Sequence, residues 1–351
     1  MRSYFNKFLL LGIVVLTSCS QSKETDSSAL DFTLEDFESF NFTDEDGDII
    51  TPDDLTLGKP YLLSVLSDSV IAIQDNATSN MVTFLNLSNG KFTQGIRQGN
   101  GPEELLQITT MMRYKNLLWV AGMDDGKVLA FEFDADSMKT TMRNSTSLSM
   151  NPARTIVIDD EDLFVLAPFF SGDRYYRIRT NTVDTIRKFP MDSVMLGVPS
   201  DNSYLQADMS ISPDHKHIMI SNRDWNILEI YDISTGDIRT LRGPIEQNAK
   251  VRRQDIGMGY RYIQTPIWFM YNGNSADNSG FYVGFSGTEI KAKEDLGTYP
   301  KTILSFDWNG NPRKAYHFDS PIINFTIDEK NGVLYAIQNM PDPVVVRYTL
   351  K

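Results

Sequence analysis

The stretch Met209–Leu241 (MSISPDHKHIMISNRDWNILEIYDISTGDIRTL) has the pattern of four short strands in a row. Short polar segments separate these strands: SPDHK at 212–216, NRDW at 222–225 and STGD at 234–237. Clusters of Ser, Pro, Asn, Asp and Gly between alternating apolar runs are typical of hairpin turns. The stretch therefore predicts a four-stranded antiparallel sheet, which is the repeating unit of β-propellers.

Looser copies of this unit fill most of the chain. The clearest apolar alternation in each unit contains Val82, Val128, Tyr176, Leu228, Ile303 and Val345. These positions recur about every 40 to 50 residues, except for a longer interval before Ile303, and such a period with four strands per unit indicates a propeller. Five units have four strands and the last has three. We therefore predict an all-β, six-bladed β-propeller with four antiparallel strands per blade.

The ring needs one more strand, because an incomplete blade leaves an unpaired sheet edge. The uneven alternation of Phe32–Phe42 is compatible with a strand that precedes the first complete unit. We expect this N-terminal strand to complete the sixth blade and close the ring.

Composition limits the possible partners. The 351 residues carry a formal net charge of −13 and contain no basic run. An acidic surface repels nucleic acid and anionic membrane surfaces, so no nucleic acid partner and no charge-driven membrane binding is expected. The only cysteine is Cys19, which excludes disulfides within the chain and cysteine-ligated metal in the propeller.

The N-terminus has the pattern of an export signal. Arg2 and Lys7 precede an apolar run at 8–16, and Leu-Thr-Ser-Cys follows at 16–19. The run is shorter than the roughly 20 residues of a membrane-spanning helix, so a cleaved signal is expected. The segment resembles a bacterial lipoprotein signal, which implies that Cys19 is acylated, for example with palmitate. An ordinary signal peptide with a chance cysteine is the alternative.

This pattern divides the chain into a signal peptide with lipobox (1–19), a polar tether (20–30) and the propeller (31–351). The resemblance implies a lipid-anchored protein of the cell envelope, at the outer membrane. The sequence does not distinguish the periplasmic from the surface side.

The connection between the first two units contains Gly99, Gly101, Pro102 and Glu103. It resembles the G-x-G-x-GPGE turn of the TolB-like six-bladed β-propeller lipoproteins of Bacteroidota. The segments DWNGN (307–311) and FTIDEKNGVLYAIQ (325–338) look similar to the same family. Glu103 departs from the pattern, which has Gly there, and Gly alone enters positive-φ regions freely. The resemblance implies the fold and the lipid anchor, but no settled activity.

No hydrolase, zinc-protease, Walker or dinucleotide motif is present, so we predict no catalytic residues. His215 and His217 could share one side of a strand, but no third metal ligand is evident, and a surface turn is the favoured interpretation. The connection 243–263 is basic and aromatic, and arginine and tyrosine suit acidic or sugar-like ligands. Its candidate ligand-binding residues are Arg252, Arg253, Tyr260, Arg261 and Tyr262. A charge-balanced surface loop is the alternative.

Two function classes remain open. The first is a tethered propeller that binds a glycan, a peptide or another envelope protein. The second is a metal-dependent hydrolase or lyase, because lactonase-like six-bladed propellers resemble this fold and hold calcium at the channel mouth. Side chains of the type that calcium requires are Asp75, Asn76, Asp124, Asp125, Asn222 and Asp224.

Overall fold

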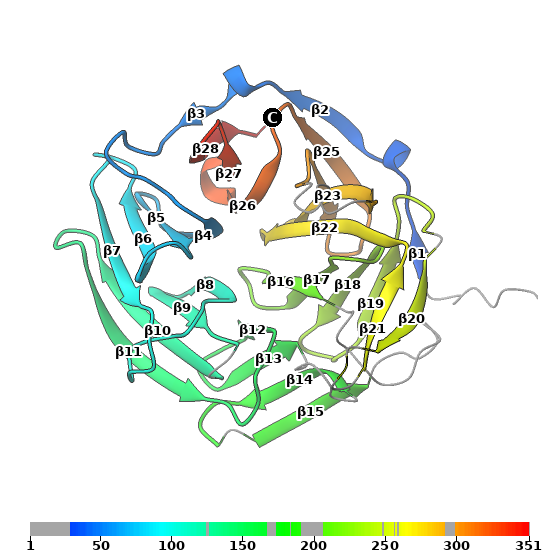
Figure 1. Cartoon of the computed structure of the whole chain (residues 1–351), viewed down its shortest axis with the longest axis horizontal. Helices are drawn as coiled ribbons and strands as arrows, with labels where there is room; N and C mark the ends of the chain where they lie inside the picture. Colours follow the sequence, from blue (N-terminus) through cyan, green and yellow to red (C-terminus); the bar gives the residue numbers. More distant parts are fainter. Residues whose placement is uncertain are drawn as a thin grey trace, which may run out of the picture.

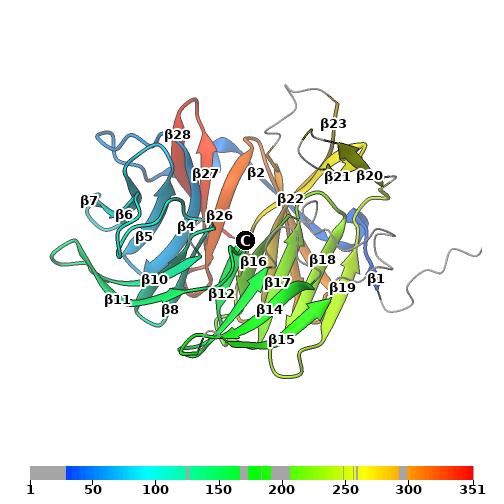
Figure 2. The same cartoon turned by 60° about the horizontal axis from the view of Figure 1, so that its bottom comes forward.

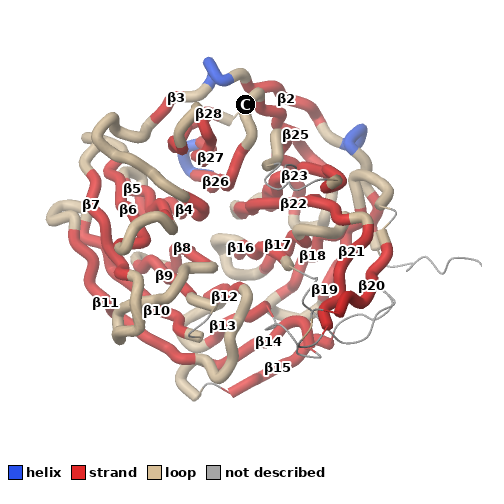
Figure 3. Tube along the Cα trace, viewed as in Figure 1, coloured by secondary structure: helices blue, strands red, loops and turns tan. Residues whose placement is uncertain are grey.

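Six sheets form a ring around a central channel (Figure 1, Figure 2), which confirms the predicted six-bladed propeller. The computed structural model describes residues 29–123, 126–166, 173–182, 184–190, 206–247, 249–255, 257, 260–291 and 299–350. Strands account for most of these residues (Figure 3). Among the described residues, no helix has the length and hydropathy needed to cross a membrane.

Each of the first three blades is a four-stranded antiparallel meander. Blade 1 contains β4 (Pro60–Ser67), β5 (Val70–Asp75), β6 (Asn80–Asn86) and β7 (Phe92–Arg97). Blade 2 contains β8 (Thr110–Tyr114), β9 (Leu117–Ala121), β10 (Lys127–Asp134) and β11 (Lys139–Ser147). Blade 3 contains β12 (Arg154–Val157), β13 (Asp162–Leu166), β14 (Asp173–Arg179) and β15 (Asp184–Pro190).

The other three blades each recruit a strand from the N-terminal segment. Blade 4 contains β16 (Ala207–Ile211), β17 (His217–Asn222), β18 (Ile227–Asp232), β19 (Ile238–Arg242) and β1 (Leu30–Asp31). Blade 5 contains β22 (Ile267–Ala276), β23 (Gly280–Ile290), β24 (Thr302–Asp307), β25 (Pro312–Phe318) and β2 (Glu38–Phe42). Blade 6 contains β26 (Ile322–Asp328), β27 (Val333–Asn339), β28 (Pro343–Thr349) and β3 (Asp48–Ile49).

Short elements lie outside this pattern. The hairpin of β20 (Lys250–Asp255) and β21 (Tyr260–Thr265) stands between blades 4 and 5 in the chain. Three short 3-10 helices are η1 (Leu34–Asp36), η2 (Asp44–Asp46) and η4 (Glu329–Asn331).

The closing strand is not the one expected. Residues 32–42 do not complete blade 6; β3, only two residues long, does so by pairing antiparallel with β28. The preceding strands β1 and β2 add in parallel to the complete blades 4 and 5, through β19 and β25. The segment Leu30–Ile49, which we call the belt, therefore covers the outer edges of three neighbouring blades (Figure 1).

Aromatic residues of the belt explain its course. Phe32 and Phe37 are buried in a core cluster with residues of blades 4 and 5, and Phe42 is buried in a cluster with residues of blades 5 and 6. A large apolar side chain contributes about 1.5 to 3 kcal/mol when it is fully buried. Each of these three phenylalanines therefore packs where two blades meet.

Aspartates set the tight turns at one end of the blades. The Asp232 carboxylate accepts hydrogen bonds from the backbone nitrogens of Ser234 (2.8 Å) and Thr235 (2.9 Å), an arrangement that favours a turn. The hydrogen bonds from Ser234 and Thr235 lower the pKa of Asp232. Asp307 and Asp134 accept similar bonds from the residues that follow them. These polar positions are the turn signals that separated the strands in the sequence.

Candidate functional site: the central channel

The innermost strands β4, β8, β12, β16, β22 and β26 surround the channel (Figure 1). They all run in the same direction, so the channel has two different ends. At the loop end the inner strands begin, after the connections from the preceding blades. At the turn end they finish in tight turns to the second strand of each blade.

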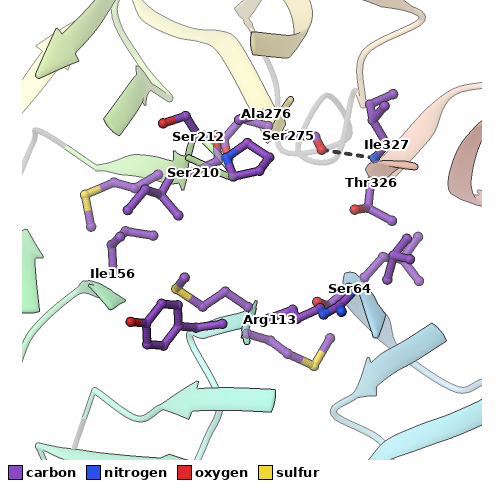
Figure 4. A pocket seen from close by; sticks show the side chains of 18 of the residues that line it. Ser64, Arg113, Ile156, Ser210, Ser212, Ser275, Ala276, Thr326 and Ile327 are labelled. Atoms are coloured by element: carbon purple, nitrogen blue, oxygen red, sulfur yellow. Dashed lines mark hydrogen bonds between the residues drawn. The ribbon is translucent and has the colours of Figure 1, made fainter. Parts of the chain in front are cut away.

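A cavity of about 470 Å³ occupies the turn end of the channel. This volume lies in the range of small-molecule sites, about 300 to 1,000 Å³. We call this cavity the channel pocket. In Figure 4 the labelled residues, among them Ser64, Arg113, Ser210 and Thr326, surround the channel pocket.

The wall of the channel pocket combines apolar and hydroxyl-bearing side chains. Its apolar members include Met111, Met112, Ile156, Met209 and Ile211. Its hydroxyl groups come from Ser64, Thr110, Tyr114, Ser210, Ser212, Ser275 and Thr326. The Ser275 hydroxyl accepts a hydrogen bond from the Ile327 backbone nitrogen at 3.0 Å (Figure 4). An apolar wall with a few polar groups is the usual composition of a small-ligand site.

The charged residues at the rim of the channel pocket differ in how they are bonded. Lys115 forms an ion pair with Asp160. The carboxylates of Asp328 and Glu329 accept hydrogen bonds from nearby asparagines. Arg113 donates from Nε to the Lys115 carbonyl oxygen (2.9 Å), and its two Nη groups make no hydrogen bond to the described residues. Those groups are available to an acceptor on a ligand.

Toward the loop end the channel narrows to a neck of about 60 Å³. The neck and the channel pocket share wall residues, among them Leu63, Met111 and Asn274, so the two spaces are adjacent. Arg154 and Asp208 also line the neck, and their side chains are joined by hydrogen bonds of 3.0 Å from Nε and 2.9 Å from Nη2. The channel therefore ends, on the loop side, at an ion pair between two adjacent inner strands.

Further polar residues surround this ion pair at the loop end. The Asp208 carboxylate, together with burial, raises the pKa of Tyr61 to about 12. Burial opposes the charge on Arg154, but Asp208 and Tyr61 more than offset it and raise the arginine pKa. Next to them, Arg223 Nε lies 2.8 Å from Asp224 Oδ1, and burial raises the Asp224 pKa despite this partner.

We call Tyr61, Arg154, Asp208, Arg223 and Asp224 the polar cluster. Ionisable groups with shifted pKa values, partly buried at the mouth of a channel, are a recurrent feature of functional sites. The charges of its two arginines and two aspartates balance. It can therefore orient a polar ligand or a water chain, but it does not form an anion site by itself.

The predicted ligand-binding residues lie in the β20–β21 hairpin. Strand pairing places Arg253 opposite Tyr262, and Arg252 opposite Ile263. The side chains of Arg252 and Arg253 are exposed, and Arg253 Nε is 3.6 Å from Asp255 Oδ1. The side chains of residues 260–262 lie outside the description. Of the five predicted residues, Arg252 and Arg253 have described side chains, and neither lines the channel pocket or the neck, so ligand binding by the hairpin stays a prediction.

The glycine-rich turn between blades 1 and 2 is held by Glu104 rather than by Glu103. A Glu104 carboxylate oxygen accepts a hydrogen bond from the Gly101 backbone nitrogen at 2.9 Å, and a Cβ at Gly99 would meet that oxygen at 2.1 Å. Lys127 Nζ donates to the carbonyl oxygens of Gly101 and Glu104. Pro102 and Glu103 are exposed.

Glu103 is also absent from the described non-glycine residues with positive φ. The departure from glycine at that position is therefore compatible with the turn.

The candidate calcium ligands are held by separate partners. The Asp75 carboxylate accepts backbone hydrogen bonds from Gly58 (2.7 Å) and Lys59 (2.8 Å). Asn222 bonds to Arg174 and Ile227, and Asp224 pairs with Arg223. Within the described parts of the chain, no group of three or more His, Cys, Asp or Glu residues could hold a metal ion. Asp124 and Asp125 lie outside the described residues.

His215 and His217 have different partners. His215 has positive φ, a conformation that favours glycine, and bonds through Nδ1 to the Ile158 carbonyl oxygen. His217 stacks on Trp308 with ring centroids 5.0 Å apart. The surface-turn interpretation stays a prediction.

Of the polar cluster, the sequence interpretation named only Asp224, as a candidate calcium ligand. The members of the cluster come from positions 61, 154, 208, 223 and 224, on three different blades. One signal was available: Arg154 and Asp208 are charged residues at the start of otherwise apolar first strands of their units. A charge on an inner strand faces either the channel or a neighbouring blade, and both positions require a partner.

Comparisons with known proteins agree with this architecture. Residues 39–330 match the family described as TolB-like 6-blade propeller-like. A solved structure from Bacteroides fragilis, described as a putative exported protein, superposes with a TM-score of 0.52 at 13% identity; the match covers 89% of this chain and 98% of that one. A Bacteroides vulgatus member of the DUF4221 family gives a TM-score of 0.55 at 10% identity, over 84% of this chain and 94% of that one.

A search among curated proteins gave no match. The two structural similarities concern the fold alone, because the identities are low. The family match spans most of the chain and agrees with the six observed blades, so the chain belongs to the TolB-like six-bladed propeller family.

Proposed function

We propose that this protein is a lipid-anchored propeller of the cell envelope that binds a small ligand in its channel. The observation that carries the proposal is the channel pocket, which has the volume and the mixed wall of a small-molecule site. The apolar body of the ligand packs against the methionines. Its hydrogen-bonding groups bond to the wall hydroxyls. The free Nη groups of Arg113 favour an acceptor such as a carboxylate at the rim.

A hydrolase or lyase is not proposed, because no observation among the described residues favours it. The exposed arginines of the β20–β21 hairpin remain candidates for a second contact with a glycan, peptide or envelope protein. They stand on the same side of the ring as the loop end, since their hairpin connects β19 to the start of β22.

The channel site is tested with a variant that fills it. Thr326 lines the channel pocket, is half-buried and makes no hydrogen bond through its side chain to the described residues. We expect Thr326→Trp to abolish saturation-transfer NMR signals from a library of small-molecule fragments that bind the wild type. The matched control is Thr349→Trp, at an exposed position of β28 in the same blade. Equal fragment binding by wild type, Thr326→Trp and Thr349→Trp would refute a channel site.

The anchor is supported by the lipobox-like segment that ends at Cys19 and by the exported character attributed to the Bacteroides fragilis neighbour. We expect Cys19→Ser to move the protein from the membrane fraction to the soluble fraction, since acyl chains provide the attachment. Mass spectrometry of the wild type should show a lipid adduct on the mature N-terminus. A Cys19→Ser protein that stays in the membrane fraction, with no lipid mass on the wild type, contradicts the anchor.

A further inference from the structure

The belt fills two grooves between blades with phenylalanine. Between blades 4 and 5, the rings of Phe32 and Phe37 lie 5.0 and 5.2 Å from the Phe306 ring. Between blades 5 and 6, the Phe42 ring stacks on Phe318 at 5.3 Å. The belt backbone pairs at the same time with the outer strands of these blades. The outer edge of this propeller thus binds an extended segment with spaced aromatic residues, namely the belt of the same chain.

The rim of blades 1 and 2 carries no belt (Figure 1). At this place a groove of about 510 Å³ lies between β7, the glycine-rich turn and the strands β10 and β11. Its floor is apolar and includes Ile96 (5% exposed), Phe131 (4% exposed) and the half-buried Met142. We call it the rim groove. It corresponds in position to the grooves that belt phenylalanines fill on the other side of the ring.

A free strand edge borders the rim groove. Strand β11 is the outermost strand of blade 2, and within the described residues its only strand partner is β10. Its nine residues, KTTMRNSTS, contain no proline and no acid. Long exposed edges of this kind accept a further strand, since their backbone groups on one side are unpaired. Thr140 and Met142 of the same strand line the rim groove.

Charge indicates which kind of segment would bind there. The belt contains eight acidic residues and no lysine or arginine. Arg97, Glu103 and Glu104 line the rim groove, and β11 contributes Lys139 and Arg143 beside it. Arg143 is paired with Glu132, and the Glu104 carboxylate accepts a hydrogen bond from the Gly101 backbone nitrogen. The exposed Arg97, Lys139 and Glu103 form no ion pair with the described residues, which leaves two bases against one acid. These basic positions favour an acidic segment over a basic one.

We propose that the rim groove binds an extended acidic segment of a partner protein. One aromatic side chain of that segment packs on the apolar floor, and its backbone pairs with the free edge of β11. Strand addition supplies the main-chain hydrogen bonds, and the pocket beside the strand supplies side-chain specificity. This inference concerns a different surface from the channel pocket and does not depend on the proposed function.

The test uses a synthetic peptide with the belt sequence, residues 30–49, labelled with a fluorophore. In the intact protein the belt covers its own blades, so the added peptide has the free rim as its site. We expect saturable binding by fluorescence anisotropy. A peptide with alanine in place of its four phenylalanines should bind at least about tenfold more weakly, a change that corresponds to 1.4 kcal/mol.

Variants of the protein locate the site. Met142→Glu places a charge on the apolar floor and Thr140→Trp fills the rim groove, so each should weaken peptide binding at least about tenfold. Lys91→Glu, at an exposed position before β7, changes the net charge more and should leave binding unchanged. Melting temperatures of all variants verify folding. If Met142→Glu does not fold, Thr140→Trp alone tests the rim groove.

Hydrogen exchange separates the possible outcomes. The proposal requires new protection of β11 amides when the peptide is bound. The proposal is overturned if binding is not saturable or if both groove variants bind the peptide as the wild type does. It is also overturned if protection is confined to blades 4 to 6, because that result would show that the peptide exchanges with the belt.

Discussion

Replacing Phe42 with alanine is expected to lower the free energy of unfolding by about 3 to 5 kcal/mol. Phe42 is 2% exposed and its ring contacts Phe318 and Tyr348, so the change leaves a cavity where blades 5 and 6 meet. The loss is large because the belt contributes the last strand of blade 6, and the contacts that hold the belt also close the ring. Urea denaturation measures the effect.

Leu34→Ala is the matched control for Phe42→Ala. Leu34 lies in the same belt but is 42% exposed, and substitutions at such positions usually change stability by less than about 0.5 kcal/mol. If Phe42→Ala unfolds at the same urea concentration as Leu34→Ala, the belt does not close the ring in the way described.

Replacing Glu229 with alanine is expected to lower the free energy of unfolding by about 3 to 5 kcal/mol, because it breaks a buried ion pair. Arg174 Nη1 lies 2.9 Å from Glu229 Oε2, and both side chains are 5% exposed. The Tyr175 hydroxyl and Asn222 Nδ2 donate to the same carboxylate. Removal of the glutamate leaves the Arg174 charge buried between blades 3 and 4 without its acidic partner.

Two further variants check this explanation. The double variant Arg174→Met/Glu229→Leu should recover part of the lost stability, because an apolar pair has no charge to desolvate, while the buried Tyr175 hydroxyl loses its acceptor. Glu132→Ala removes the partner of Arg143 in an exposed ion pair and should cost less than about 1 kcal/mol. A Glu229→Ala protein as stable as Glu132→Ala would show that the buried pair is unimportant for blade packing.

The architecture could be predicted because propeller blades are local. In Met209–Leu241, strands that pair are neighbours in sequence, and the turns between them carry aspartate, serine and glycine. The alternation of apolar residues and these turn residues therefore specify each blade without reference to the others. The closing strand depends instead on a contact between Ile49 and Val346, far apart in the chain, and two residues carry no strand pattern.

The site could be predicted less well for the same reason. Tyr61, Arg154 and Asp208 come together only when three blades take their places in the ring. Sequence composition instead drew attention to Arg252 and Arg253, which cluster locally in one hairpin. In the glycine-rich turn, the sequence does not indicate which side chain bonds the loop backbone, and only the geometry selects Glu104.

Crystallographic fragment screening tests the central claim, that the channel is the ligand site, most directly. We expect fragments to concentrate in the channel pocket, with polar groups near Arg113 and the wall hydroxyls and apolar groups against Met111 and Met209. Fragments that leave the channel empty and gather instead on the β20–β21 hairpin would contradict it.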